Sequence, residues 1–399
     1  MSTLPPLPQG FKTAGLHCGV KKDPELFDLS LFISDTPCAA AGVFTQNRVC
    51  GAPVKVSRQR VPAPGVRGVV INSGNSNACT GERGITDARW MTAEVAKRIG
   101  CREEEILVCS TGVIGRFLPR EPLQSGIEAI VPQLGTTADH FHQAARGMMT
   151  TDTHPKQSTR STTIQGKEVR VSGCSKGAAM IAPNMATMLC TIMTDAGIDS
   201  PTADAMLRKA VGSSFNCISV EGHTSTSDTV LLLANGASGT KNYSPLELEE
   251  LQKLITEVAE DLAQAIINDA EGATHIITID VEGLRTREEA YTIAKAVADS
   301  PLNKTAIAGA DPNWGRIVSS CGYAGVDLQE ENISLWLNGT LLYKSGVPQE
   351  FDATAVSAGI RNQRQTHVEL KFDLGTAGIR YWTADLTAEY VRLNADYTT

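Results

Sequence analysis

Short apolar runs alternate along the chain with longer segments whose apolar residues recur every three or four positions. The short runs have the length of β-strands and cover residues 28–33, 42–48, 65–71, 187–194, 228–234 and 275–284. The longer segments are predicted helices and cover residues 86–100, 121–134, 137–149 and 245–266. Because strands and helices are mixed in both halves, we expect an α+β fold in which helices cover sheets.

Turn and capping residues mark the ends of several predicted elements. Thr86 or Asp87 is expected to cap the helix that ends near residue 100. The Gln-Gly pair at 165–166 predicts the tight turn of a hairpin. Ser244 and Glu247 have the spacing of a capping box at the start of the longest predicted helix.

Composition and charge exclude several classes of protein. The 399 residues are enough for two or three domain-sized units, or for two halves that share one core. The net charge of −8 is spread along the chain without a basic arm, which argues against a nucleic-acid partner. The first residues lack an apolar region, so we expect no secretory signal, and because no apolar stretch reaches about 18 residues, we expect no membrane span.

The cysteines and histidines do not indicate a metal site. None of the ten cysteines is part of a CxxC pair, and the histidines have no ligand-like spacing, so we expect no bound metal. Unpaired cysteines fit a reducing compartment, and we expect a cytoplasmic protein, with an organelle as the alternative.

Residues 176–189 contain the candidate for covalent chemistry. A turn at 183–184 and the small residue Ala186 lead directly to Thr187, the first residue of a predicted buried strand. Such a threonine can attack the preceding carbonyl, and hydrolysis of the resulting ester frees an α-amine with a pKa of about 8, which can act as its own base. Taken alone, the same pattern also describes an ordinary turn that enters a core strand.

Further segments carry a resemblance to a known family. In chain order they are CSTGVIGR (109–116), MMTTDTHPK (148–156), KGAAMIAPNMATML (176–189), HTSTSDT (223–229), NDAEGATH (268–275), ADPNWGR (310–316) and YVRLNADYTT (390–399). Together they resemble the ornithine acetyltransferases, the glutamate N-acetyltransferases of arginine biosynthesis. The resemblance covers essentially the whole chain.

The resemblance implies catalytic roles for four residues. Cleavage would fall between Ala186 and Thr187, and Thr187 would be the nucleophile of both self-cleavage and transfer. Thr111 and Gly112 match the oxyanion-hole pair, and a hydroxyl and a backbone N–H are suitable donors to a developing oxyanion. Without the resemblance, the residues around Thr111 would be interpreted as a turn or a very weak phosphate loop.

The resemblance also implies a set of substrate-binding residues. They are Thr150, Lys176, Thr187, Glu271, Asn394 and Thr399. By charge, Lys176 would pair with the α-carboxylate of an amino acid and Glu271 with the ammonium of ornithine. The alternatives are a lysine on a solvated loop and a glutamate at a helix end, and Thr151 could replace Thr150.

The implied fold is an N-terminal-nucleophile-like layered sandwich of β-sheets between helices. Self-cleavage would give an α chain of residues 1–186 and a β chain of residues 187–399 that share one core, with two copies of each in a heterotetramer.

The implied reaction is ping-pong transfer of acetyl from N-acetylornithine to glutamate without a cofactor. Whether acetyl-CoA is a second donor stays open. The alternatives are an N-terminal-nucleophile amidase or aminopeptidase of related architecture, and an uncleaved relative that only binds ligands.

Overall fold

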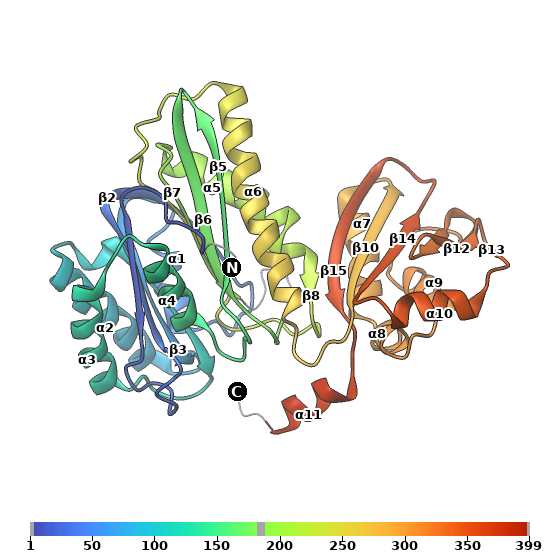
Figure 1. Cartoon of the computed structure of the whole chain (residues 1–399), viewed down its shortest axis with the longest axis horizontal. Helices are drawn as coiled ribbons and strands as arrows, with labels where there is room; N and C mark the ends of the chain where they lie inside the picture. Colours follow the sequence, from blue (N-terminus) through green and yellow to red (C-terminus); the bar gives the residue numbers. More distant parts are fainter. Residues whose placement is uncertain (1–3, 182–187, 397–399) are drawn as a thin grey trace. The chain divides into compact units, whose positions relative to one another are not determined.

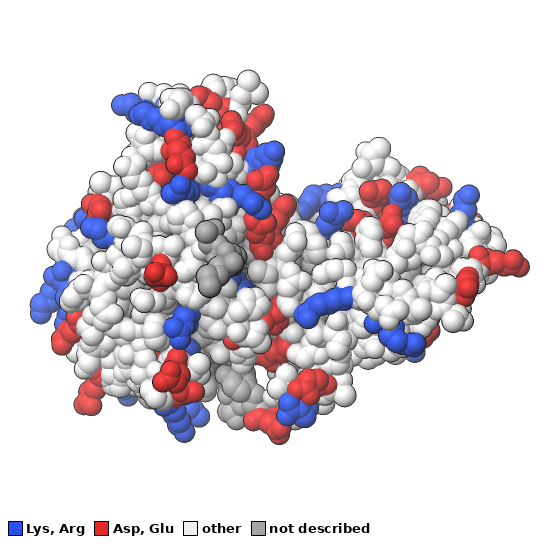
Figure 2. All heavy atoms as spheres, viewed as in Figure 1, with Lys and Arg blue, Asp and Glu red and all other residues white. Residues whose placement is uncertain are grey.

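The computed structural model describes residues 4–181 and 188–396, and the chain forms two compact units (Figure 1). The first unit contains Met1–Asn216 and His223–Ile266, and the second contains Cys217–Gly222 and Ile267–Thr398. Acidic and basic side chains are interspersed over the face of each unit that Figure 2 shows. Among the described residues, no helix is long and apolar enough to cross a membrane.

The first unit is built on one sheet with the strand order β4-β3-β2-β9-β7-β6-β5, and β1 pairs with β2. The strands are β1 (Phe11–Leu16), β2 (Leu29–Phe44), β3 (Ala63–Asn75), β4 (Ile106–Val113), β5 (Lys156–Ile164), β6 (Lys167–Lys176), β7 (Leu189–Thr194) and β9 (Thr229–Ala234). Strand β2 lies inside this order and links its two halves. Its first part pairs with β1 and β3, and its last part, from Ala39 to Phe44, pairs with β9.

The sheet turns back on itself at β2. Its register shifts between Ile33 and Cys38, and one hydrophobic cluster contains Ile71 and Leu107 from β3 and β4 together with Cys174 from β6, near the other end of the order. Side chains from both ends of the sheet therefore meet in one core. We call β1, β3, β4 and the first part of β2 the first layer, and β5, β6, β7, β9 and the last part of β2 the second layer.

Helices pack against the two layers. They are α1 (Ala52–Arg58), α2 (Gly81–Ile99), α3 (Arg120–Ile130), α4 (Ala138–Met148), α5 (Ser200–Ser213) and α6 (Pro245–Asn268). A second cluster joins Val70 of the first layer to Met91 of α2 and Leu123 of α3. Leu262 of α6 lies over Gly173 of the second layer. The predicted α+β class and the layered arrangement of sheets and helices are confirmed.

The second unit has a seven-stranded sheet with the order β13-β12-β11-β14-β10-β15-β8. Its strands are β8 (Ile218–Ser219), β10 (Ile276–Leu284), β11 (Ser334–Leu337), β12 (Thr340–Lys344), β13 (Val347–Pro348), β14 (Gln365–Lys371) and β15 (Ala377–Ala384). Its helices are α7 (Arg287–Asp299), α8 (Pro301–Ala308), α9 (Trp314–Gly322), α10 (Ala353–Arg361) and α11 (Ala388–Asp396). Helix α7 packs on β10 and β15.

Several predicted element ends are confirmed. Helix α2 ends at Ile99, and Gly100 follows in the left-handed conformation. The turn at 165–166 joins β5 to β6. The capping box is present, because the Ser244 N–H donates to Glu247 Oε2 at 2.7 Å and the Glu247 N–H donates to Ser244 Oγ at 3.4 Å.

Two predicted boundaries are wrong. The runs 28–33 and 42–48 belong to one strand, β2, because the exposed residues 35–37 between them interrupt the apolar pattern but not the extended backbone. Helix α2 begins at Gly81, before the predicted caps Thr86 and Asp87. Asp87 is buried within the helix, and its carboxylate accepts a hydrogen bond from Arg120 Nε at 2.7 Å.

Candidate active site

The end of β4 holds Thr111 and Gly112 in a shape that requires glycine at the second position. In the parallel ladder Gly112 lies opposite Gly74 of β3. Its φ of +124° belongs to glycine, and a Cβ there would lie 2.4 Å from the carbonyl carbon of Gly74. The fold therefore presents the backbone of residue 112 directly beside the Thr111 side chain.

Lys176, at the end of β6, reaches across the two layers to Thr111. Its Nζ donates to Thr111 Oγ1 at 3.1 Å, and the two residues are 4% and 6% exposed. Since the Thr111 oxygen accepts this bond, its own proton stays available to another acceptor. The ammonium of Lys176 beside this oxygen makes the Thr111 hydroxyl a stronger donor, which suits an oxyanion hole.

Asp152 fixes the surroundings of Lys176 and Thr150. Its carboxylate accepts hydrogen bonds from Lys156 Nζ at 2.6 Å, from the Gly177 N–H at 2.6 Å and from the Thr150 N–H at 2.9 Å. Burial alone would raise the pKa of Asp152, but the charges of Lys156 and Lys176 and these hydrogen bonds lower it to about 2. The carboxylate is therefore ionised at neutral pH and offsets two buried ammonium groups.

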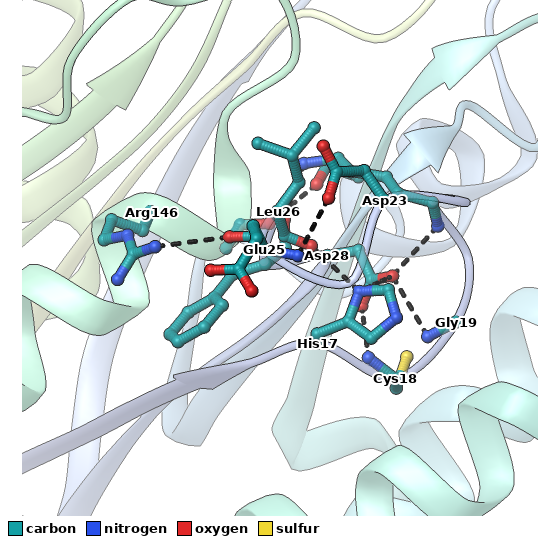
Figure 3. Close-up of polar contacts among 12 residues, drawn as sticks. His17, Cys18, Gly19, Asp23, Glu25, Leu26, Asp28 and Arg146 are labelled. Carbon is teal, nitrogen blue, oxygen red and sulfur yellow. Dashed lines mark hydrogen bonds and ion pairs between the residues drawn. The ribbon is translucent and has the colours of Figure 1, made fainter.

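The loop after β1 is folded around a buried carboxylate (Figure 3). Asp28 accepts hydrogen bonds from the N–H groups of Cys18 at 2.7 Å, Gly19 at 3.2 Å and Lys21 at 2.9 Å. His17 Nδ1 lies 3.4 Å from the same carboxylate. This turn fixes the position of the Lys21 backbone.

The Lys21 side chain brings a third amine to this region. Its Nζ donates to the carbonyl of Met149 at 2.7 Å, next to Thr150. Burial and, less strongly, the charge of Lys176 lower the pKa of Lys21 to about 8, against the opposing effect of Asp28 and Asp152. Lys21 therefore holds the chain beside a predicted substrate-binding residue.

The start of β7 lies next to this group of residues. Leu189 pairs with Lys176 of β6 on one side and with Thr229 of β9 on the other. The Met188 N–H donates to the buried carboxylate of Asp228 at 3.0 Å. Lys176 therefore connects the Thr111 hydroxyl to a strand that begins two residues after the predicted nucleophile.

Two predicted substrate-binding residues meet in the second unit. Asn394 Nδ2, on α11, donates to Glu271 Oε2 at 3.1 Å. This contact joins two segments that are 123 residues apart. The predicted residues Ala186, Thr187 and Thr399 lie outside the described residues, as does the cleavage point itself, so the division into 1–186 and 187–399 stays a prediction.

The described residues contain no group of three or more His, Cys, Asp or Glu side chains that could hold a metal ion. The ten cysteines all lie in the described ranges and form no disulfide with one another. Among the charged side chains of the first unit's site, Asp152 and Lys156 form a buried ion pair at 2.6 Å.

A family model described as the ArgJ family matches residues 12–399. This chain belongs to the ArgJ family. The arginine biosynthesis bifunctional protein ArgJ of Rhodopirellula baltica is 42% identical over 396 residues, which are 98% of this chain and 96% of that protein. Its namesake from Geobacter sulfurreducens is 42% identical over 393 residues, 98% of this chain and 99% of that protein.

A crystal structure of the ArgJ protein from Bacillus halodurans is 34% identical and has a TM-score of 0.50. The match covers 52% of this chain and 98% of the Bacillus halodurans chain. Membership of the ArgJ family confirms the predicted resemblance and the predicted class of enzyme, a glutamate N-acetyltransferase. It favours the transferase over the amidase alternative.

Sequence reasoning missed three charged residues of this ArgJ site: Lys21, Asp152 and Asp228. One signal was available for Asp228, the single charged residue in the predicted strand 228–234. Asp152 lies in a segment that supported the resemblance, but its pairing with buried lysines depends on the fold.

Proposed function

We propose that this chain is a self-processing acetyltransferase that carries acetyl from N-acetylornithine to glutamate on Thr187. The hydrogen bond from Lys176 to Thr111 is the observation that carries the proposal. Thr111 is a donor suited to an oxyanion, and Lys176 is the strand partner of Leu189, which lies two residues beyond Thr187 in the sequence. Gly112 adds a backbone N–H at the same strand end.

In self-cleavage, Thr187 Oγ attacks the carbonyl carbon of Ala186. Thr111 and Gly112 stabilise the negative charge on the carbonyl oxygen, the bond from that carbon to the Thr187 nitrogen breaks, and an ester forms. Water then hydrolyses the ester. The products are a chain that ends at Ala186 and a chain that begins with the free α-amine of Thr187.

In transfer, that amine takes the proton of the Thr187 hydroxyl as its oxygen attacks the acetyl carbonyl of N-acetylornithine. The amide bond breaks, and ornithine leaves with the proton. The amino group of glutamate then attacks the acetyl ester, which releases N-acetylglutamate and restores the hydroxyl. The same donors, Thr111 and Gly112, serve the tetrahedral intermediate of each half-reaction.

The remaining predicted residues supply recognition. Thr150 donates its N–H to Asp152, and Lys176 precedes Gly177, which does the same. The carboxylate of Glu271 suits the distal ammonium of ornithine. Thr399 completes the predicted set. We further propose that acetyl-CoA is a second donor, which the word bifunctional in the names of the relatives supports.

We expect the two chains to stay associated as a heterotetramer of two α and two β chains in the cytoplasm. Cysteines without disulfides fit a compartment that keeps thiols reduced. Size measurements on the purified, cut protein test the predicted assembly.

The proposal is tested by intact mass and by a donor and acceptor assay on purified wild type, Thr187→Ala and Thr187→Ser. Wild type should give two chains, the second beginning at Thr187, and should form N-acetylglutamate from N-acetylornithine. Thr187→Ala should stay whole and inactive, while Thr187→Ser keeps a hydroxyl and should cleave slowly. An active wild type that remains one chain contradicts the proposed cleavage. Release of acetate at a rate independent of glutamate contradicts transfer.

A further inference from the structure

Both backbone polar groups of Met188 are held by two consecutive residues of the β9 region. The Met188 N–H donates to Asp228 Oδ1 at 3.0 Å, and the Met188 carbonyl accepts from the Thr229 N–H at 3.0 Å. The amide nitrogen of Met188 is bonded covalently to the carbonyl carbon of Thr187. Asp228 therefore holds the amide of Met188, the residue that follows the predicted nucleophile in the sequence.

The Asp228 carboxylate is rigidly placed. The residue is 1% exposed, and its own carbonyl accepts from the Thr45 N–H at 2.9 Å. Oδ1 accepts from Met188, whereas Oδ2 has no hydrogen-bond partner among the described residues. A buried carboxyl group with one unpartnered oxygen is costly to maintain, which indicates a role beyond closing a strand.

Burial is the largest influence on the pKa of Asp228. Burial raises its pKa well above the usual value, and the opposing influences are the Met188 N–H, the charge of Lys176 and the nearby hydroxyls of Ser225 and Thr45. Neither of those hydroxyls donates to Oδ2 in hydrogen-bond geometry. The interaction of Asp228 with Met188 is therefore the main directional contact of this side chain.

We propose that Asp228 is the positioning residue for the nucleophile: by holding the amide that follows Thr187, it fixes the direction from which the Thr187 hydroxyl attacks. This inference rests on the proposed role of Thr187. A displacement of about 1 Å at a reacting group can cost about 10²-fold in rate. Self-cleavage and transfer use the same hydroxyl, so both depend on this contact.

The chain offers a matched control at the other end of β7. Asp195 directly follows Thr194, is also buried, and also accepts backbone hydrogen bonds, from Gln9 at 3.0 Å and Arg170 at 2.9 Å. A variant of Asp195 perturbs the same strand without touching the residue next to the nucleophile. It separates a general loss of stability from a loss of positioning.

The experiment compares Asp228→Ala and Asp228→Asn with Asp195→Ala and Asp195→Asn. Cleavage is followed by intact mass after a pulse of expression, transfer is measured on protein matured by long incubation, and thermal unfolding is recorded for each. Asp228→Ala should slow cleavage about 10²-fold and lower kcat to a similar extent, with the KM for N-acetylornithine within threefold of wild type. Asp228→Asn keeps an acceptor for Met188 and should lose only about tenfold.

The Asp195 variants should unfold at lower temperature but cleave within threefold of wild type. If Asp228→Ala does not fold, the comparison of the two asparagine variants decides. Rates for the Asp228 variants within threefold of wild type, or equal slowing by the Asp195 variants, overturn the positioning role. A wild type that stays whole and inactive overturns instead the proposed role of Thr187.

Discussion

The contact between Lys176 and Thr111 gives one hydroxyl two distinct roles. The Thr111 oxygen accepts a hydrogen bond from the Lys176 ammonium, and the hydroxyl proton of Thr111 is available to a developing oxyanion. Nothing in the local sequence indicates this pairing, because the two residues are 65 positions apart and come from different layers. The sequence supported Thr111 through family resemblance, but it suggested a substrate carboxylate, not a hydroxyl, as the partner of Lys176.

Thr111→Ala should therefore slow transfer by about 10²–10³-fold, the usual cost of losing one oxyanion donor. Thr111→Ser keeps the hydroxyl and should retain most of the activity. Single-turnover acetylation of the matured enzyme by N-acetylornithine measures the effect. An alanine variant within a few-fold of wild type would show that Thr111 only supports Lys176.

Asp152 predicts a specific dependence of stability on pH. Its pKa is about 2 in the folded chain and about 3.9 in an unfolded one, so the folded state favours the ionised form. The sign follows directly: the stabilisation is present above pH 4 and is lost as the pH falls towards 2. The stabilisation at neutral pH is roughly 2–3 kcal/mol.

Asp152→Asn should remove this contribution and leave Lys156 without its carboxylate. Urea unfolding of both proteins between pH 2 and pH 7 tests the prediction. The free energy of unfolding of the wild type should exceed that of the variant most at neutral pH. The difference should narrow by about 2 kcal/mol towards pH 2. A gap that does not change with pH would mean that the carboxylate is not ionised in the folded protein.

At the scale of elements, turn chemistry was predicted more accurately than strand continuity. Gly100, the hairpin turn at 165–166 and the Ser244 capping box each depend on neighbours in the sequence, so local patterns identify them. Strand β2 could not be recognised as one element, because the exposed residues 35–37 interrupt its apolar pattern where the sheet turns. The start of α2 was missed because Asp87 serves Arg120 and not the helix end.

The junction of β3 and β4 gives a prediction at this scale. Gly112→Ala should abolish cleavage and reduce stability, since a Cβ would collide with the Gly74 backbone and φ is positive. Gly115→Ala is the matched control, because Gly115 also has a positive φ, of +77°, but no atom lies within 4 Å of its Cβ position. The control should lose only about 1–2 kcal/mol. Chemical unfolding and intact mass compare the two, and equal behaviour would contradict the steric argument.

At the scale of the whole molecule, the sequence predicted the class of fold and allowed two or three units, but it did not predict the boundaries of the two units. The second unit takes residues 217–222 from the middle of the chain, and no change in composition marks those boundaries. The predicted site residues are distributed over both units: Thr111 and Lys176 belong to the first, Glu271 and Asn394 to the second. Long-range pairing decides such a distribution, and it leaves no periodic signal.

The Glu271 carboxylate leads to a prediction about substrate choice. Glu271→Gln keeps the shape and an acceptor for Asn394 but loses the charge, so the kcat/KM for N-acetylornithine should fall about 10-fold to 100-fold. An acetyl donor without an ammonium should be affected much less. Glu389→Gln, an exposed change on the same helix as Asn394, is the control. Equal losses for both donors would remove Glu271 from recognition of the ammonium.

The strand order also determines what a cut before Thr187 would do to the molecule. In the second layer, β7 and β9 of the later segment lie between β6 and β2 of the earlier one. The two products would therefore be interleaved and held by two backbone ladders, Val171–Lys176 against Leu189–Thr194 and Ala39–Phe44 against Thr229–Ala234. For the two products to separate, strands β7 and β9 would have to leave the middle of the sheet together. The association of the two products therefore does not depend on the peptide bond that is cut.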